Sequence, residues 1–125
     1  MSKKIYALKV TKHEANGTVL RDLYNILLKS YKVLESYPGT SSLGNVTAIL
    51  EIREGQNIGI ETQGGNHSRL PDSLKNFVSK NCDTIFCSCL SSGKTVTEIE
   101  KLKPTYEVIF CEKQTADALW RMAKE

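Results

Sequence analysis

A Gly-Lys-Thr triplet at residues 93–95 is the clearest chemical signal in the chain, because it matches the end of a phosphate-binding loop. The complete pattern, G-x-x-x-x-G-K-[ST], needs a first glycine five positions before Gly93, and Ser88 stands there instead. The triplet follows an apolar run and precedes residues with helical spacing, which is the usual context of an anion site. The residues expected to hold the anion are Ser91, Ser92, Gly93, Lys94 and Thr95. The alternative is a serine-capped helix that leaves Lys94 in solvent.

A second loop of this kind, "KHEANGT", lies near the amino terminus. Asn16 and Gly17 stand at the entry to a predicted helix, where unpaired backbone N–H groups attract phosphate. Arg21 lies one turn further on, and we expect it to reach the same anion. No lysine stands at the helix start, and Thr18 alone cannot replace the lysine and the magnesium-binding hydroxyl that phosphoryl transfer needs. The alternative for Asn16 and Gly17 is a plain turn and helix cap.

A third loop, "TQGGNHSR", is the most polar segment of the chain. Its paired glycines, Gly64 and Gly65, allow a ligand to approach the backbone closely. The side chains that offer hydrogen bonds or positive charge are Gln63, Asn66, His67 and Arg69. His67 lacks a carboxylate partner within the motif, so the pattern does not favour it as a general base. We expect this loop to close over the base or ribose of a ligand.

The pattern of titratable residues contains no catalytic machinery. No aspartate pair, Ser-His-Asp set or Cys-His pair stands out, so we expect no catalytic residues and no required cofactor. Cys87 and Cys89 form a C-x-C pair, which on a strand faces one side and does not give a zinc knuckle. We therefore expect no metal site and buried, reduced cysteines.

The composition fits one domain over residues 1–125. The formal net charge is +3, and lysine and arginine never form a run of five. Scattered charge of this kind argues against DNA or RNA as a partner. No apolar stretch is long enough for a signal peptide or a membrane span, and the cysteine usage fits a reducing compartment. We therefore expect a cytoplasmic protein without a membrane partner.

The elements that position these loops alternate between strands and helices. Strands are expected at residues 4–11, 32–37, 46–52, 57–63, 82–90 and 105–113. Helices are expected at residues 18–31, from 71 onward, at 91–102 and at 115–124. The turn "REGQN" predicts an antiparallel hairpin. This order predicts a three-layer α/β/α fold with a mainly parallel sheet, in which ligands bind at the carboxyl ends of the strands.

The last helix carries Trp120 beside Leu119 and Met122. This amphipathic pattern indicates core or interface packing rather than base stacking, and it favours a homodimer. An open alternative is a protein-interaction module in which this helix docks a partner and the nucleotide pocket is vestigial.

Taken together, these segments resemble the small P-loop proteins of phages and bacteria, compact relatives of the nucleotide kinases. The resemblance runs from "YALKVT" and "NGTVLRDLYNILL" through "IGIETQGGNHSRLPDSLKNFVSKNCDTIFCSCLSSGKTVTEIEKL" to "YEVIFCEK". In that group the first loop carries the glycine, lysine and threonine that grip phosphates, and here "HEANGTVL" lacks the lysine. The loop before "GKTV" tends to carry arginines, and here Leu90 and Ser92 occupy it. The resemblance implies a P-loop-like fold with a degenerate Walker A loop.

A fold with nucleotide-site loops and without the catalytic lysine predicts binding without turnover. The leading hypothesis is a non-catalytic protein that captures an adenine nucleotide or an ADP-ribose-like, including cyclic, signal. An analogy with small phage proteins that sequester host immune nucleotides extends this hypothesis to an anti-defence sponge in the host cytoplasm. The enzymatic alternative is a small nucleoside or nucleotide kinase in which Lys94 or Arg21 replaces the missing lysine.

Overall fold

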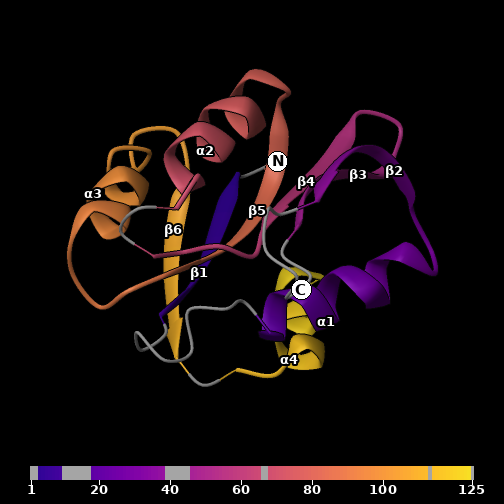
Figure 1. The fold of residues 1–125 in the computed structure, drawn as a ribbon. Helices are drawn as coiled ribbons and strands as arrows, with labels where there is room; N and C mark the ends of the chain where they lie inside the picture. Colours follow the sequence, from indigo (N-terminus) through magenta and orange to yellow (C-terminus); the bar gives the residue numbers. More distant parts are fainter. Residues whose placement is uncertain (1–2, 10–17, 39–45, 66–67, 113, 125) are drawn as a thin grey trace.

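The computed structural model describes residues 3–9, 18–38, 46–65, 68–112 and 114–124. These residues form six strands and four helices in an α/β arrangement, with β2, β3 and β4 following one another directly (Figure 1). The strands are β1 (Lys4–Lys9), β2 (Lys32–Pro38), β3 (Val46–Arg53), β4 (Gln56–Glu61), β5 (Cys82–Cys89) and β6 (Glu107–Glu112). The helices are α1 (Thr18–Leu28), α2 (Leu70–Ser79), α3 (Lys94–Glu100) and α4 (Ala116–Lys124).

The strands form one mixed sheet in the order β2-β3-β4-β5-β1-β6. β1 pairs in parallel with β5 and β6, and β4 pairs in parallel with β5. β3 and β4 form the expected antiparallel hairpin, whose turn places Gly55 at φ 82°, in the left-handed region that favours glycine. The segment 32–37 is also a strand, which pairs antiparallel with β3 at the edge of the sheet. The prediction of a mostly parallel sheet with an antiparallel hairpin is confirmed.

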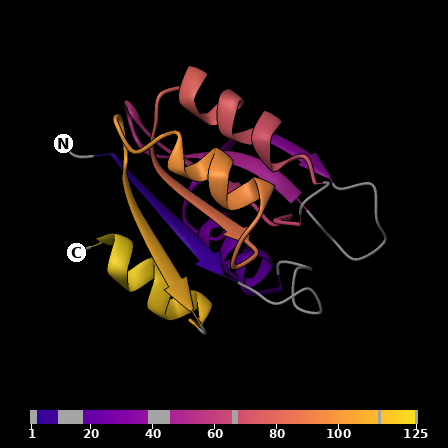
Figure 2. The ribbon, with the colours of Figure 1, turned by 90° about the vertical axis from the view of Figure 1, so that its left-hand side faces the viewer.

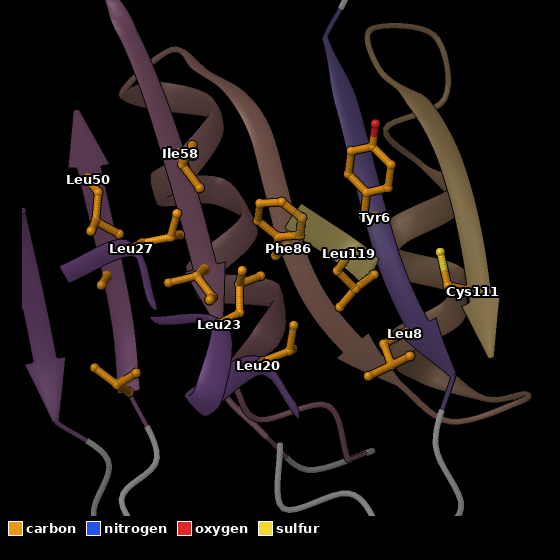
Figure 3. Packing of buried hydrophobic residues seen from close by; sticks show 13 residues of the cluster. Tyr6, Leu8, Leu20, Leu23, Leu27, Leu50, Ile58, Phe86, Cys111 and Leu119 are labelled. Atoms are coloured by element: carbon orange, nitrogen blue, oxygen red, sulfur yellow. The ribbon is translucent and has the colours of Figure 1, made fainter. Parts of the chain in front are cut away.

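α1 and α4 cover one face of the sheet. Leu20, Leu23 and Leu27 recur at helical spacing and are fully buried, as is Leu119 on α4. Figure 3 shows these leucines against the sheet residues that share the cluster. The labelled sheet members of the cluster are Tyr6, Leu8, Leu50, Ile58, Phe86 and Cys111.

α2 and α3 cover the opposite face, as Figure 2 shows. Leu70, Leu74 and Phe77 of α2 are buried there, together with Ile99 of α3. A Cβ atom at Gly59 would lie 2.6 Å from the ring of Phe77, so this glycine lets α2 approach β4 closely. Cys87 and Cys89 lie in the same cluster, which confirms that they share one face. All four cysteines of the chain are buried and unbridged, as expected.

Two helix boundaries differ from the prediction. The helix expected at 18–31 ends at Leu28, because the backbone N–H groups of Lys29 and Ser30 bond to carbonyls three residues back and tighten the last turn. The helix expected from Ser91 begins at Lys94, because Gly93 adopts φ 110° and ψ −160°, outside the helical region. Gly93 is the N-cap and no side chain caps the helix, so the serine cap of the alternative does not form, whereas Lys94 is exposed, as that alternative expected.

A threonine side chain caps the start of α4. The backbone N–H of Ala118 donates to Thr115 Oγ1 at 3.1 Å, which is the hydrogen bond expected of a threonine cap. No helix in the described part of the chain is long and apolar enough to cross a membrane.

Candidate functional site

The carboxyl ends of the parallel strands meet at one edge of the sheet. The register pairs Lys9 with Cys89 and with Glu112, and it pairs Glu61 with Cys87. The segments that follow β4 and β5 therefore leave the sheet side by side. The segment that follows β1, with Asn16 and Gly17, lies outside the described residues, as do Asn66 and His67. We call this edge, with Gln63–Gly65, Ser68–Arg69 and Leu90–Thr95, the carboxyl-edge site.

A buried carboxylate anchors the carboxyl-edge site. Glu61, the last residue of β4, is fully buried. Its Oε1 accepts hydrogen bonds from Thr47 Oγ1 at 2.5 Å, from Ser73 Oγ at 2.6 Å and from Arg69 Nε at 3.0 Å. Its Oε2 accepts the backbone N–H of Gln63 at 2.9 Å. The carboxylate therefore ties β3, the start of α2 and the loop after β4 together.

A second set of contacts fixes the loop against β5. Ser88 Oγ donates to the backbone carbonyl of Thr62 at 3.1 Å. A Cβ atom at Gly64 would overlap the backbone carbonyl of Ser88, so only glycine allows the loop to lie this close to β5. A Cβ atom added at Gly65 would have no other atom within 4 Å. The first glycine of the pair is therefore a packing requirement, and the second lies in open space.

The side chains of the β4 loop are partly used within the protein. Arg69 forms an ion pair with Glu61 and keeps 26% of its side chain exposed. Gln63 is half-buried, and Ser68 Oγ donates to the backbone carbonyl of Gly65 at 2.7 Å. Because Glu61 offsets the charge of Arg69, this arginine is a weaker anion ligand than its sequence position suggested.

The β5 loop presents its polar groups to solvent. Ser91, Ser92, Gly93 and Lys94 are exposed, whereas Thr95 is fully buried. Lys94 forms no ion pair with any described residue. The hydroxyl of Thr95 has no hydrogen-bond partner among the described residues. Two of the predicted anion ligands lie on α1. Thr18 begins this helix, and Arg21 is half-buried on it.

Burial raises the pKa values of the cysteine thiols. Desolvation raises the pKa of Cys89, at the end of β5, to about 11, although the Lys9 ammonium lowers it in part. The pKa of Cys87 is raised well above its ordinary value, first by burial and then by Cys89, Glu61 and Cys111. A raised pKa favours the protonated thiol at neutral pH, and a protonated thiol is a poor nucleophile. No group of three or more metal-binding side chains gathers within the described ranges.

In the described part of the carboxyl-edge site, the accessible side chains suit contact with an anion better than proton transfer. Ser91, Ser92, Gly93 and Lys94 are exposed at the carboxyl edge, where residues of these types can contact an anion. Glu61, which the sequence analysis missed, is enclosed and accepts four hydrogen bonds, so it is not placed to remove a substrate proton. The signal that could have revealed Glu61 is a carboxylate at the end of the apolar run "IGIET".

Comparisons of the chain with protein-family models, with curated proteins and with solved structures gave no match.

Proposed function

We propose that this protein binds a nucleotide at the carboxyl-edge site without turning it over. The ligand is an adenine nucleotide or an ADP-ribose-like molecule, including cyclic forms. Its phosphate lies against Gly93, Lys94 and the entry to α1, and the loop after β4 covers its base or ribose. The proposal includes a three-layer, P-loop-like arrangement with a degenerate phosphate loop.

One observation carries the proposal: Gly64 packs directly against the backbone of Ser88. This contact brings the loop after β4 to the end of the neighbouring parallel strand, so polar groups from two loops share one site. Ligands of open α/β sheets bind at such an edge. The conformation of Gly93 supports the same site, because its φ of 110° with ψ −160° is a backbone state confined to glycine and found at ligand sites.

The state of the charged groups supports the proposal of binding without turnover. The Glu61 carboxylate is enclosed, and Arg69 is paired with it. Lys94 is exposed and follows β5. A P-loop enzyme carries its lysine in the loop after the first strand instead. Sequestration of a host signal in the cytoplasm, as an anti-defence sponge and as a homodimer, is the biological role that this proposal suggests.

A thermal-shift screen tests the proposal. The panel contains mononucleotides, cyclic dinucleotides and cyclic ADP-ribose isomers, with magnesium present and absent. A ligand at a hundred times its dissociation constant should stabilise the fold by roughly 2.7 kcal/mol. The bound ligand is then recovered after denaturation and its mass measured.

Each result of the screen decides between functions. An intact ligand supports sequestration, whereas conversion of ATP and a nucleoside into products supports the kinase alternative. A panel without any stabilising nucleotide contradicts the proposal and favours an interaction module.

A further inference from the structure

A cavity of about 630 Å³ lies at the other edge of the sheet, among the amino ends of β1, β4 and β5. Its floor includes Tyr6 and Thr84, on the sheet face that α1 and α4 cover. Its wall includes Tyr31, just after α1, and Trp120 on α4. Figure 3 shows the hydroxyl of Tyr6 pointing toward the start of β1, which is the end of the strand where the cavity lies. We call this hollow the amino-edge cavity; it shares no residue with the carboxyl-edge site.

The aromatic side chains of the amino-edge cavity are held in place by their neighbours. Tyr6 stacks on Phe86 with ring centroids 5.5 Å apart, and its hydroxyl donates to the backbone carbonyl of Met122 at 3.5 Å. Trp120 meets the ring of Tyr31 edge to face at 5.8 Å. Rings fixed by packing lose little entropy when they bind a ligand, so the cavity presents a preformed aromatic wall.

Positive charge surrounds this aromatic wall. Among the described residues, the cations that line the cavity are Lys4, Arg53 and Lys124, and the lining carboxylate is Asp83. None of the four forms an ion pair with another described residue. The ammonium of Lys124 lies 5.5 Å from the centre of the Trp120 ring, so ring and charge face the same space.

The helix ends moderate this charge. α1 and α4 both end at the amino edge, and the carbonyl end of each helix carries a partial negative charge. Together with Asp83, these ends offset much of the charge of the three cations. The remaining field fits a ligand with a single anionic group and disfavours a triphosphate.

We propose that the amino-edge cavity is a second ligand site, which binds a small planar aromatic ring carrying one phosphate or carboxylate group. The ring lies against Tyr31 and Trp120, above Tyr6, which is 3% exposed, and the anionic group lies at the rim, where the side chains of Lys4 and Arg53 line the cavity. The volume is in the range of small-molecule sites and accommodates a mononucleotide. This site does not depend on the function proposed for the carboxyl edge.

Trp120 provides a direct readout, because it is the only tryptophan in the chain and lines the cavity. Its fluorescence is titrated with AMP and with para-hydroxybenzoate, which represent the nucleotide and the aromatic-carboxylate sources of this chemistry. Adenosine supplies a ring without the anion, and ribose phosphate supplies an anion without the ring. We expect AMP or para-hydroxybenzoate to change the emission in a saturable way, and the two partial ligands to bind at least about tenfold more weakly.

Charge variants locate the bound ligand. The double variant Lys4→Gln, Arg53→Gln should weaken binding about tenfold, because each charge contact at the rim contributes a factor of a few. The matched control is Lys75→Gln, which removes an exposed cation from α2, on the opposite face of the sheet. Lys94→Ala, at the carboxyl-edge site, should leave the titration unchanged.

The outcomes separate the two sites. The proposal is overturned if neither aromatic anion changes the emission, or if the double variant binds as tightly as the parent chain. A signal that Lys94→Ala abolishes and the double variant keeps also overturns it, and places the ligand at the carboxyl edge instead. Loss of the signal in the double variant alone supports the amino-edge cavity, whatever the nucleotide screen returns.

Discussion

The two edges of the sheet differ in how they are built. The carboxyl-edge site consists of short polar loops held by backbone contacts and by one buried carboxylate. The amino-edge cavity consists of large rings and long cationic side chains that come from β1, β3, α4 and the turn after α1. The first edge therefore depends on glycine and on hydrogen bonds, whereas the second depends on side-chain packing.

This difference decides what a substitution does at each edge. Removal of a polar anchor at the carboxyl edge leaves buried donors without an acceptor, which costs stability. Removal of a rim charge at the amino edge leaves the core intact and changes ligand affinity alone. Substitutions that affect both edges equally would contradict this contrast.

The largest effect is expected for Glu61→Ala. The substitution leaves the Thr47 and Ser73 hydroxyls without this acceptor and removes the ion pair of the partly buried Arg69 with Glu61. Loss of one partner of a buried ion pair costs about 3–5 kcal/mol, so the free energy of unfolding in urea should fall by that amount. Glu54→Ala, an exposed carboxylate in the β3–β4 turn, is the control and should change stability by less than about 0.5 kcal/mol. A loss below about 1 kcal/mol at Glu61 would show that the carboxylate is not an anchor.

The second-largest loss of stability is expected for Gly64→Ala. The added methyl group meets the Ser88 backbone, which cannot move as a flexible side chain could, so we expect a loss of about 1–3 kcal/mol. The neighbouring Gly65→Ala places its methyl group in open space and should be nearly neutral. Urea unfolding of both variants measures the difference. Equal stability of the two would remove the observation on which the carboxyl-edge site rests.

The sequence predicted the elements better than it predicted the sites. Alternation and helical spacing located the strands and the inward leucines, because these patterns arise from burial within each element. The end of α1 and the start of α3 were missed, since tightened turns and the Gly93 conformation leave no periodic signal.

The sites show the same limit. The Gly-Lys-Thr and Gly-Gly motifs are local, so their loops were placed at the correct edge of the sheet. The roles of Glu61 and Arg69 were not foreseen, because their ion pair depends on how α2 packs beside β4. The amino-edge cavity left no motif at all, since Tyr6, Tyr31 and Trp120 are far apart in the sequence and meet only in the folded chain.

A smaller effect on the free energy of unfolding is expected at high pH, from the buried cysteines at the two ends of β5. Burial, with help from Asp83 and Glu35, raises the pKa of Cys82 at the amino end from 9.0 to about 12, although Lys3 opposes the shift. Burial raises the pKa of Cys89 at the carboxyl end from 9.0 to about 11. A raised pKa in the folded state gives stability that is complete below pH 9 and is lost as pH rises through the folded value.

We therefore expect the free energy of unfolding, measured in urea with reductant, to fall between pH 8 and pH 10. Each thiol should contribute roughly 1 kcal/mol of this fall at pH 10. Cys82→Ala and Cys89→Ala should each flatten the pH profile, and Cys82→Ala should flatten it over a wider range because its folded pKa is higher. An unchanged profile in either variant would mean that the thiol is accessible in the folded protein.

The smallest effect on the fold, and the sharpest test of the carboxyl-edge site, is expected for Lys94→Ala. Lys94 is exposed and has no ion pair with a described residue, so its removal should change the free energy of unfolding by less than about 0.5 kcal/mol. Loss of one contact between an ammonium and a phosphate should nevertheless lower the affinity for the nucleotide found in the screen by roughly tenfold. Calorimetry measures this affinity. Lys75→Ala, also exposed, is the matched control and should bind as the parent chain does. Lys94→Arg keeps a cation that can bind a phosphate group, so this variant should bind more tightly than Lys94→Ala does. Unchanged affinity in Lys94→Ala would contradict a role for this lysine in holding the phosphate.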